Sequence, residues 1–142
     1  QVTGRVGRNE HASSVIVQSY QPTHPSVQFG IKQDYTGFYD HAIAERKRTQ
    51  FPPFTYLLKL ICVYKTEAAA IRASNELANS LKPHLVRGAK IFGPVPAFYE
   101  RSRDTYRWQI IVKSPSRSAL LDLLPRVPPA RWQTDIDPAS LL

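Results

Sequence analysis

The chain has 142 residues, about one domain's worth, and its 19 Lys and Arg against 11 Asp and Glu give a formal net charge of +8. The hydrophobic fraction of 42% excludes a wholly disordered tail, and no apolar run approaches the roughly 18 residues that span a bilayer. No secretion signal opens the sequence, and the single Cys62 excludes an internal disulfide or multi-thiolate zinc site, so we expect a soluble, cytoplasmic, basic protein.

The N-terminal third is predicted to contain one strand followed by one or two helices. The β-branched run 15–20 predicts a buried strand that closes a preceding sheet. Apolar residues recur at helical spacing within 26–48, and the basic cluster at the end of this range suits the last turn of a helix. The Phe-Pro-Pro-Phe stretch at 51–54 ends this part as a rigid joint.

The rest of the sequence predicts the element order β-α-β-β-α-β. Thr66 is a good N-cap for the first helix, and Ser116 caps a second helix that includes Leu124. This order is that of the ferredoxin-like α+β sandwich, with two helices on one face of a four-stranded antiparallel sheet and the other face left for a partner domain or ligand. The predicted strands are 56–64, 89–97 (interrupted by Gly93-Pro94), 106–113 and 131–136, and the first helix is 67–81.

The first eight residues follow the pattern Q-x-x-G-R-x-G-R, which resembles motif VI of superfamily 2 helicases. Arg5 and Arg8 are three residues apart, so they lie on one side of a helical turn, and Gly4 permits close approach of a neighbouring lobe. Such arginines stabilise charge on a transferred γ-phosphoryl group, whereas the alternative is a Gly-Arg loop without a nucleotide role. No G-x-x-x-x-G-K-[ST] loop occurs, so the segment alone is expected to be inactive.

Further stretches, taken together, resemble the PriA family of primosomal replication restart helicases. They are Asp34-Tyr35, Phe38-Tyr39, Glu45-Arg46, Phe51 to Phe54, Gly93 to Pro96, Tyr106 to Gln109, Ser114 to Arg117, and Trp132 with Asp135 to Pro138. The resemblance covers the whole chain and implies three parts. Residues 1–22 would end the second, RecA-like helicase lobe, 23–53 would form a helical connector, and 54–142 would form a C-terminal domain that binds DNA and partners.

The resemblance implies an ATP-dependent 3′–5′ DNA helicase that recognises stalled or branched replication forks and starts primosome assembly for replication restart. The implied partners are branched and single-stranded DNA, the acidic tail of single-stranded DNA-binding protein and other primosome proteins. ATP and Mg²⁺ are the implied cofactors of the longer protein. Zinc is also implied, but its cysteines are expected upstream of Gln1. Because the sequence lacks Met and begins inside the helicase pattern, we expect it to be a piece of a longer chain.

The resemblance also assigns residues. Arg5 and Arg8 match catalytic arginines at the ATP γ-phosphate, with Gln1 and Gly4 beside the nucleotide. Arg117 matches an arginine that helps to hold the acidic protein tail. Leu121 stands where the family often has Gln, so one hydrogen-bonding group of that site is missing.

The basic C-terminal half supplies the candidate DNA contacts. Residues 82–131 hold ten basic residues against three acidic ones, and seven of the ten are arginine, which matches phosphate or carboxylate. A solvated basic surface is the equally weighted alternative. Trp108 could stack on a base, although burial in the core is favoured. The candidate DNA-binding residues are Arg101, Arg103, Arg107 and Lys113. The competing functional hypothesis is a stand-alone ferredoxin-like nucleic-acid adaptor without ATPase activity.

Overall fold

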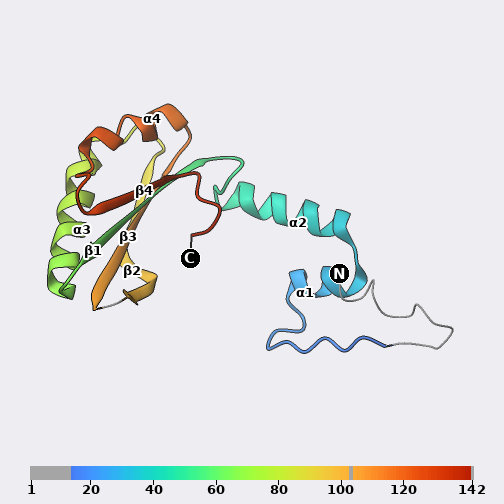
Figure 1. Cartoon of the computed structure of the whole chain (residues 1–142). Coiled ribbons are helices and arrows are strands. Elements are labelled where there is room, and N and C mark those ends of the chain that lie inside the picture. The colour runs from blue at the N-terminus through green and yellow to red at the C-terminus, as the bar shows by residue number, and fades with distance from the viewer. Residues whose placement is uncertain (1–13, 103, 142) are drawn as a thin grey trace. The chain divides into compact units, whose positions relative to one another are not determined.

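The computed structural model describes residues 14–102 and 104–141. The chain divides into an N-terminal unit, residues 1–45, and a C-terminal unit, residues 46–142, each of which is described by itself (Figure 1). The residues assigned to helicase motif VI lie outside the described residues, so their predicted role stays a prediction.

The N-terminal unit contains α1, Pro25–Lys32, and most of α2, Tyr35–Arg48, which confirms the two-helix alternative. α1 ends at Gln33, whose φ of 55° is left-handed and turns the chain. Asp34 then caps α2, because its Oδ1 accepts a hydrogen bond from the Gly37 N–H at 2.8 Å. A Cβ at Gly37 would meet the Asp34 carboxylate and the Phe29 ring, so a larger residue at this position would have to displace one of these side chains.

The predicted strand at 15–20 is wrong. Residues 14–20 contain no regular secondary structure, and the side chain of Ile16 is 92% exposed. A β-branched run forms a strand only where a neighbouring strand takes up its backbone hydrogen bonds. Within the part of the chain that the structure describes, no strand pairs with this run.

The C-terminal unit is a four-stranded antiparallel sheet with helices on one face (Figure 1). Local signals position the first strand and helix as predicted: Thr66 Oγ1 accepts the Ala69 N–H at 3.3 Å and starts α3. The spatial order of the strands is β2-β3-β1-β4, so β2 and β4 are the edges. The elements are β1 Tyr56–Tyr64, α3 Glu67–Leu81, β2 Lys90–Ser102, β3 Thr105–Ser114, α4 Arg117–Leu121 and β4 Trp132–Ile136, with 3-10 turns at Lys82–His84 and Leu124–Arg126.

The hydrophobic core lies between the sheet and the two helices. Alternate residues of the central strands point toward the helices, as the two-residue period of a strand requires. Trp108 packs against this core, which confirms the favoured reading, and its indole Nε1 is buried without a hydrogen-bond partner among the described residues. The fully buried members with the largest side chains are Leu58, Leu60, Leu81, Ile110, Val112 and Leu120.

β2 is longer than predicted, and its interruption at Gly93-Pro94 is confirmed as a register shift against β3 between Phe92 and Val95. Gly93 has a φ of 89°, and a Cβ there would lie 2.9 Å from the carbonyl oxygen of Gln109. Only glycine therefore allows β2 to bulge at this point and continue.

The second helix of the C-terminal unit is shorter than predicted. α4 ends at Leu121, and Leu124 lies in a separate 3-10 turn instead of the same helix. Pro125 explains the difference, because it has no N–H to donate and disfavours the α conformation of the residue before it.

Candidate DNA and partner interface

The candidate DNA residues fall into two groups. Arg101 pairs with Tyr106 in the β2–β3 ladder, at the end of the sheet where these strands join, whereas Arg103 lies outside the described residues. Arg107 and Lys113 both lie on the sheet face away from α3 and α4, because they alternate with core residues of β3. We call this face the open face; its central residues are Leu57, Lys59, Ile61 and Val63 of β1 and Arg107, Gln109, Ile111 and Lys113 of β3.

Lys113 is bound to the joint that precedes the sheet. Its Nζ donates to the Thr49 carbonyl at 3.4 Å and lies 3.4 Å from the centroid of the Phe51 ring and 4.9 Å from that of Phe92. Burial lowers the pKa of Lys113, and repulsion from Lys90 lowers it further. A cation between two rings is already well stabilised, so this geometry favours a structural role for Lys113 over contact with DNA.

Arg107 is the better placed of the two cations. It is half-buried beside Val63 on β1, and no ion pair of its guanidinium is found among the described side chains. The neighbouring Gln109 has a buried Oε1 without a hydrogen-bond partner among the described residues. Arg107 and Gln109 share the open face, and both are half-buried.

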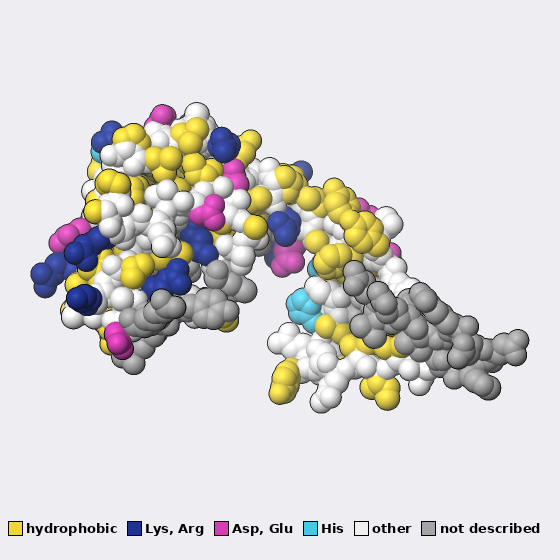
Figure 2. Space-filling view, viewed as in Figure 1, with side chains coloured by type: hydrophobic (Ala, Val, Ile, Leu, Met, Phe, Trp, Pro, Cys, Tyr) yellow, Lys and Arg dark blue, Asp and Glu magenta, His cyan; other side chains and the backbone are white. Residues whose placement is uncertain are grey.

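The C-terminal segment covers part of the open face. After β4, Asp137 adopts a left-handed φ of 52°, and the Lys59 Nζ donates to the Ser140 carbonyl at 3.2 Å. Lys59 and Leu57 are consequently buried, although both lie on the face away from the helices. The expectation that this whole face is left for a partner therefore holds only in part. Figure 2 shows Lys and Arg side chains spread over the visible face of the C-terminal unit, several of them at its lower left.

Arg117 lies at the start of α4, next to the end of β4. Its Nε donates to the Asp137 Oδ2 at 3.3 Å, and its side chain stays 54% exposed. The other carboxylate oxygen, Asp137 Oδ1, accepts the Leu57 backbone N–H at 3.0 Å. Since Asp137 takes only the Nε, the two terminal nitrogens of the guanidinium remain available for the carboxylate of a partner. Leu121 lies one turn later and is 41% exposed, so it offers an apolar contact beside Arg117.

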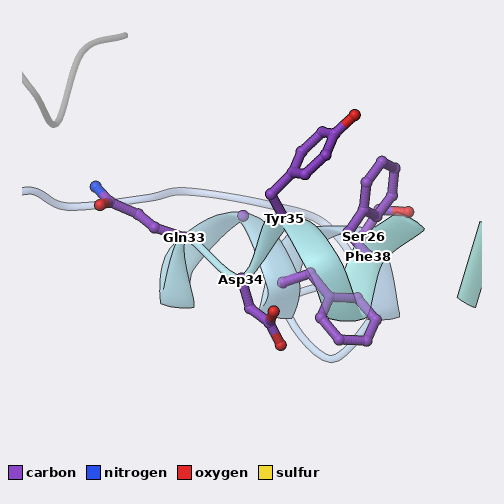
Figure 3. Close-up of a pocket in the computed structure, with 7 residues that line it drawn as sticks. Ser26, Gln33, Asp34, Tyr35 and Phe38 are labelled. Atoms are coloured by element: carbon purple, nitrogen blue, oxygen red, sulfur yellow. The ribbon is translucent and has the colours of Figure 1, made fainter. Parts of the chain in front are cut away.

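Sequence reasoning missed a pocket in the N-terminal unit (Figure 3). The pocket has a volume of about 300 Å³ and lies where α1 turns into α2. Phe29 packs edge-to-face against Phe38, with ring centroids 6.3 Å apart. The aromatic spacing on α2 is the sequence signal for this pocket, because Tyr35 and Phe38 both line it. The lining residues are Ser26, Phe29, Gly30, Gln33, Asp34, Tyr35 and Phe38.

The described residues offer no ligand set for a metal. No group of three or more His, Cys, Asp or Glu side chains able to hold a metal ion occurs in residues 14–102 and 104–141. None of the helices described here is long and apolar enough to cross a membrane. Cys62 is a buried free thiol whose pKa is raised by burial, and it packs in the core beneath α3.

Comparison with known proteins identifies the family. The family described as "Primosomal protein N C-terminal domain" matches residues 47–139. Replication restart protein PriA of Bacillus subtilis (strain 168) is 35% identical over 127 residues, which is 89% of this chain and 16% of that protein. The same-named protein of Synechocystis sp. is 33% identical over 99% of this chain and 18% of its own length, and that of Treponema pallidum is 31% identical over 100% and 23%. The chain thus spans about a fifth of the length of these relatives, and it belongs to the primosomal protein N (PriA) family, whose C-terminal domain it contains.

Proposed function

We propose that the chain is the C-terminal part of an ATP-dependent 3′–5′ DNA helicase that acts at stalled or branched replication forks and starts primosome assembly for replication restart. The family match over residues 47–139 is the observation that carries this proposal. The relatives named replication restart protein PriA are about five times longer, so the ATPase belongs to the longer protein. The protein would work in the cytoplasm, at the nucleoid.

In this proposal, residues 1–22 end the second, RecA-like helicase lobe and supply Arg5 and Arg8 to the ATP γ-phosphate, with Gln1 and Gly4 beside the nucleotide. ATP with Mg²⁺ would be bound mainly by residues upstream of Gln1, as would zinc. The C-terminal unit would be a ferredoxin-like sandwich; its β-α-β-β-α-β element order and its strand order β2-β3-β1-β4 support that topology.

The C-terminal unit would bind two anionic partners at separate places. Arg107 on the open face, with Arg101 and Arg103 near the β2–β3 turn, would contact the phosphates of single-stranded or branched DNA. Arg117 and Leu121 would hold the acidic tail of single-stranded DNA-binding protein. The free terminal nitrogens of Arg117 support this division, because a guanidinium held at Nε by Asp137 can still bind a carboxylate with both ends.

The helicase part is tested by Arg8→Ala in the full-length protein. We expect loss of DNA-stimulated ATP hydrolysis with an unchanged unfolding transition, because an arginine finger contributes to the rate and not to the fold. Normal ATP hydrolysis in this variant would remove the proposed catalytic role and favour the alternative, a nucleic-acid adaptor without ATPase activity.

The DNA contact is tested by titrating labelled single-stranded DNA with the Arg107→Ala variant over a salt series. We expect weaker binding and a shallower slope of log affinity against log salt, by about 0.7 for one lost phosphate contact. Arg72→Ala is the matched control, because Arg72 is an exposed arginine on α3, the opposite side of the sheet. If Arg107→Ala binds single-stranded DNA with the same affinity and the same salt slope as the control, the open face does not bind DNA.

A further inference from the structure

The outer edge of β4, Trp132–Ile136, presents unpaired backbone groups. β4 is an edge strand of the sheet, bonded on one side to β1 (Figure 1). The Asp137 N–H donates to the Leu57 carbonyl oxygen, and hydrogen-bonded pairs recur at every second residue of an antiparallel ladder. Gln133 and Asp135 therefore exchange hydrogen bonds with β1 as well. The N–H and C=O groups of Trp132, Thr134 and Ile136 therefore point outward. No other residue in the described ranges forms a hydrogen bond with them.

A groove lies on each face of the sheet at the start of this strand. On the helix side, about 350 Å³ is open between α3 and the segment 126–132, over Tyr64 and Trp132. On the other side, about 480 Å³ is open beside Val63 and Gln133. Both grooves share Arg131, whose guanidinium lies 5.2 Å from the centroid of the Tyr64 ring. An added strand places successive side chains on alternate faces, so these two grooves suit its alternate residues.

The charge at the start of β4 favours an acidic occupant, because the carboxylate of the strand itself, Asp135, lines neither groove and pairs with Lys59 on the open face. Arg126 and Arg131 line the helix-side groove against one carboxylate, Glu76. Neither arginine forms an ion pair with any side chain that the structure describes. Stacking of a nucleic-acid base is disfavoured, because Trp132 is 8% exposed and its ring belongs to the core.

We propose that the edge of β4 is a docking site for an extended, acidic peptide segment of a partner protein, which adds to the sheet as a fifth strand. Backbone hydrogen bonds to Trp132, Thr134 and Ile136 would supply affinity, while Arg126, Arg131 and the two grooves would select acidic and apolar side chains. This site is separate from the proposed tail contact at Arg117, and its groove beside Val63 borders Arg107, the proposed DNA contact. The proposal does not depend on either contact.

The first test uses the isolated chain and a fluorescein-labelled peptide with capped ends, in which Asp alternates with Val and Leu. Two N-methylated forms of the peptide carry the methyl groups on odd or on even residues. Since only one edge of an added strand pairs with β4, we expect one form to bind at least about tenfold more weakly than the other. Equal binding of both forms would overturn the proposal.

The second test changes the protein. Thr134→Pro removes one outward N–H and is compatible with an edge strand, so we expect peptide binding about tenfold weaker, with Thr134→Val as the control that keeps the N–H. A double variant, Arg126→Gln with Arg131→Gln, should weaken binding and reduce its salt dependence, whereas Arg87→Gln, on the exposed loop before β2, should not. Urea denaturation confirms that each variant is folded.

Two further outcomes would count against the site. If Arg117→Ala abolishes binding of the capped peptide while Thr134→Pro leaves it unchanged, the peptide binds at the start of α4 and not at β4. If single-stranded DNA displaces the peptide, and both N-methylated forms bind equally, the arginines form a general anion surface without strand addition.

Discussion

Asp137 joins the end of β4 to both β1 and α4, and its replacement by alanine removes three contributions to stability. The Leu57 N–H, in a residue 2% exposed, loses its acceptor at 3.0 Å, which costs about 1–3 kcal/mol when a buried donor is left unpaired. The ion pair with Arg117 is largely exposed and contributes about 0–1 kcal/mol. Alanine also tolerates the left-handed φ of 52° less well than aspartate does, by roughly 1 kcal/mol.

We therefore expect Asp137→Ala to lower the free energy of unfolding by about 2–5 kcal/mol. Asp137→Asn keeps an acceptor oxygen and tolerates the left-handed conformation, so it should cost only about 0–1 kcal/mol, as should Arg117→Gln. Urea denaturation followed by tryptophan fluorescence measures these differences. At a slope of about 2 kcal/mol per M, the alanine variant should lower the urea midpoint by about 1–2.5 M. If the alanine and asparagine variants unfold at the same urea concentration, Asp137 does not hold the Leu57 N–H as the structure indicates.

Three further predictions concern the packing of the C-terminal unit. Leu120→Ala should destabilise the C-terminal unit by about 2–5 kcal/mol in urea, while its neighbour Leu121→Ala, 41% exposed, should change it by less than about 0.5 kcal/mol; equal effects would contradict the placement of α4. Gly93→Ala should lower the urea midpoint, because its Cβ would meet the Gln109 carbonyl in a left-handed backbone, and an unchanged midpoint would argue against the bulge. Burial raises the pKa of Cys62, so the folded state keeps the thiol proton to higher pH than the unfolded chain does. The free energy of unfolding should accordingly fall as pH rises above the thiol pKa of the unfolded chain, about 8.5. In Cys62→Ala, the part of this pH dependence that comes from the thiol should be absent.

The sequence predicts the bounds of a helix or strand closely where capping residues and apolar spacing within the element determine them. β1 has a continuous apolar and β-branched pattern, and α3 has a cap at Thr66, a regular apolar face and a stop at Pro83, so both have the predicted bounds. The run 15–20 carries an equally strong β pattern but forms no strand, because a strand also needs a neighbour, and no pattern within the run supplies one.

The site was harder to predict, because its contacts depend on residues far apart in the chain. Lys113 was assigned to DNA from its place in a basic strand, but its position beside Phe51 depends on how the joint packs against the sheet. The contact between Arg117 and Asp137 depends on the β1–β4 register, which brings the end of β4 next to the start of α4. Likewise, the grooves beside Arg131 form where the segment before β4 passes Tyr64 and Val63 of β1, a contact that no local pattern predicts.

The central claim is that the C-terminal unit binds DNA and an acidic protein tail through different arginines. Fluorescence anisotropy tests it most directly, by titrating wild type and Arg117→Ala with labelled single-stranded DNA and with a labelled peptide of the acidic tail of single-stranded DNA-binding protein, over a salt series. We predict at least about tenfold weaker peptide binding by Arg117→Ala, with unchanged DNA affinity and salt slope. Equal loss of both ligands, with a shallower salt slope for DNA, would contradict the claim, because it would mean that one shared surface binds both anions.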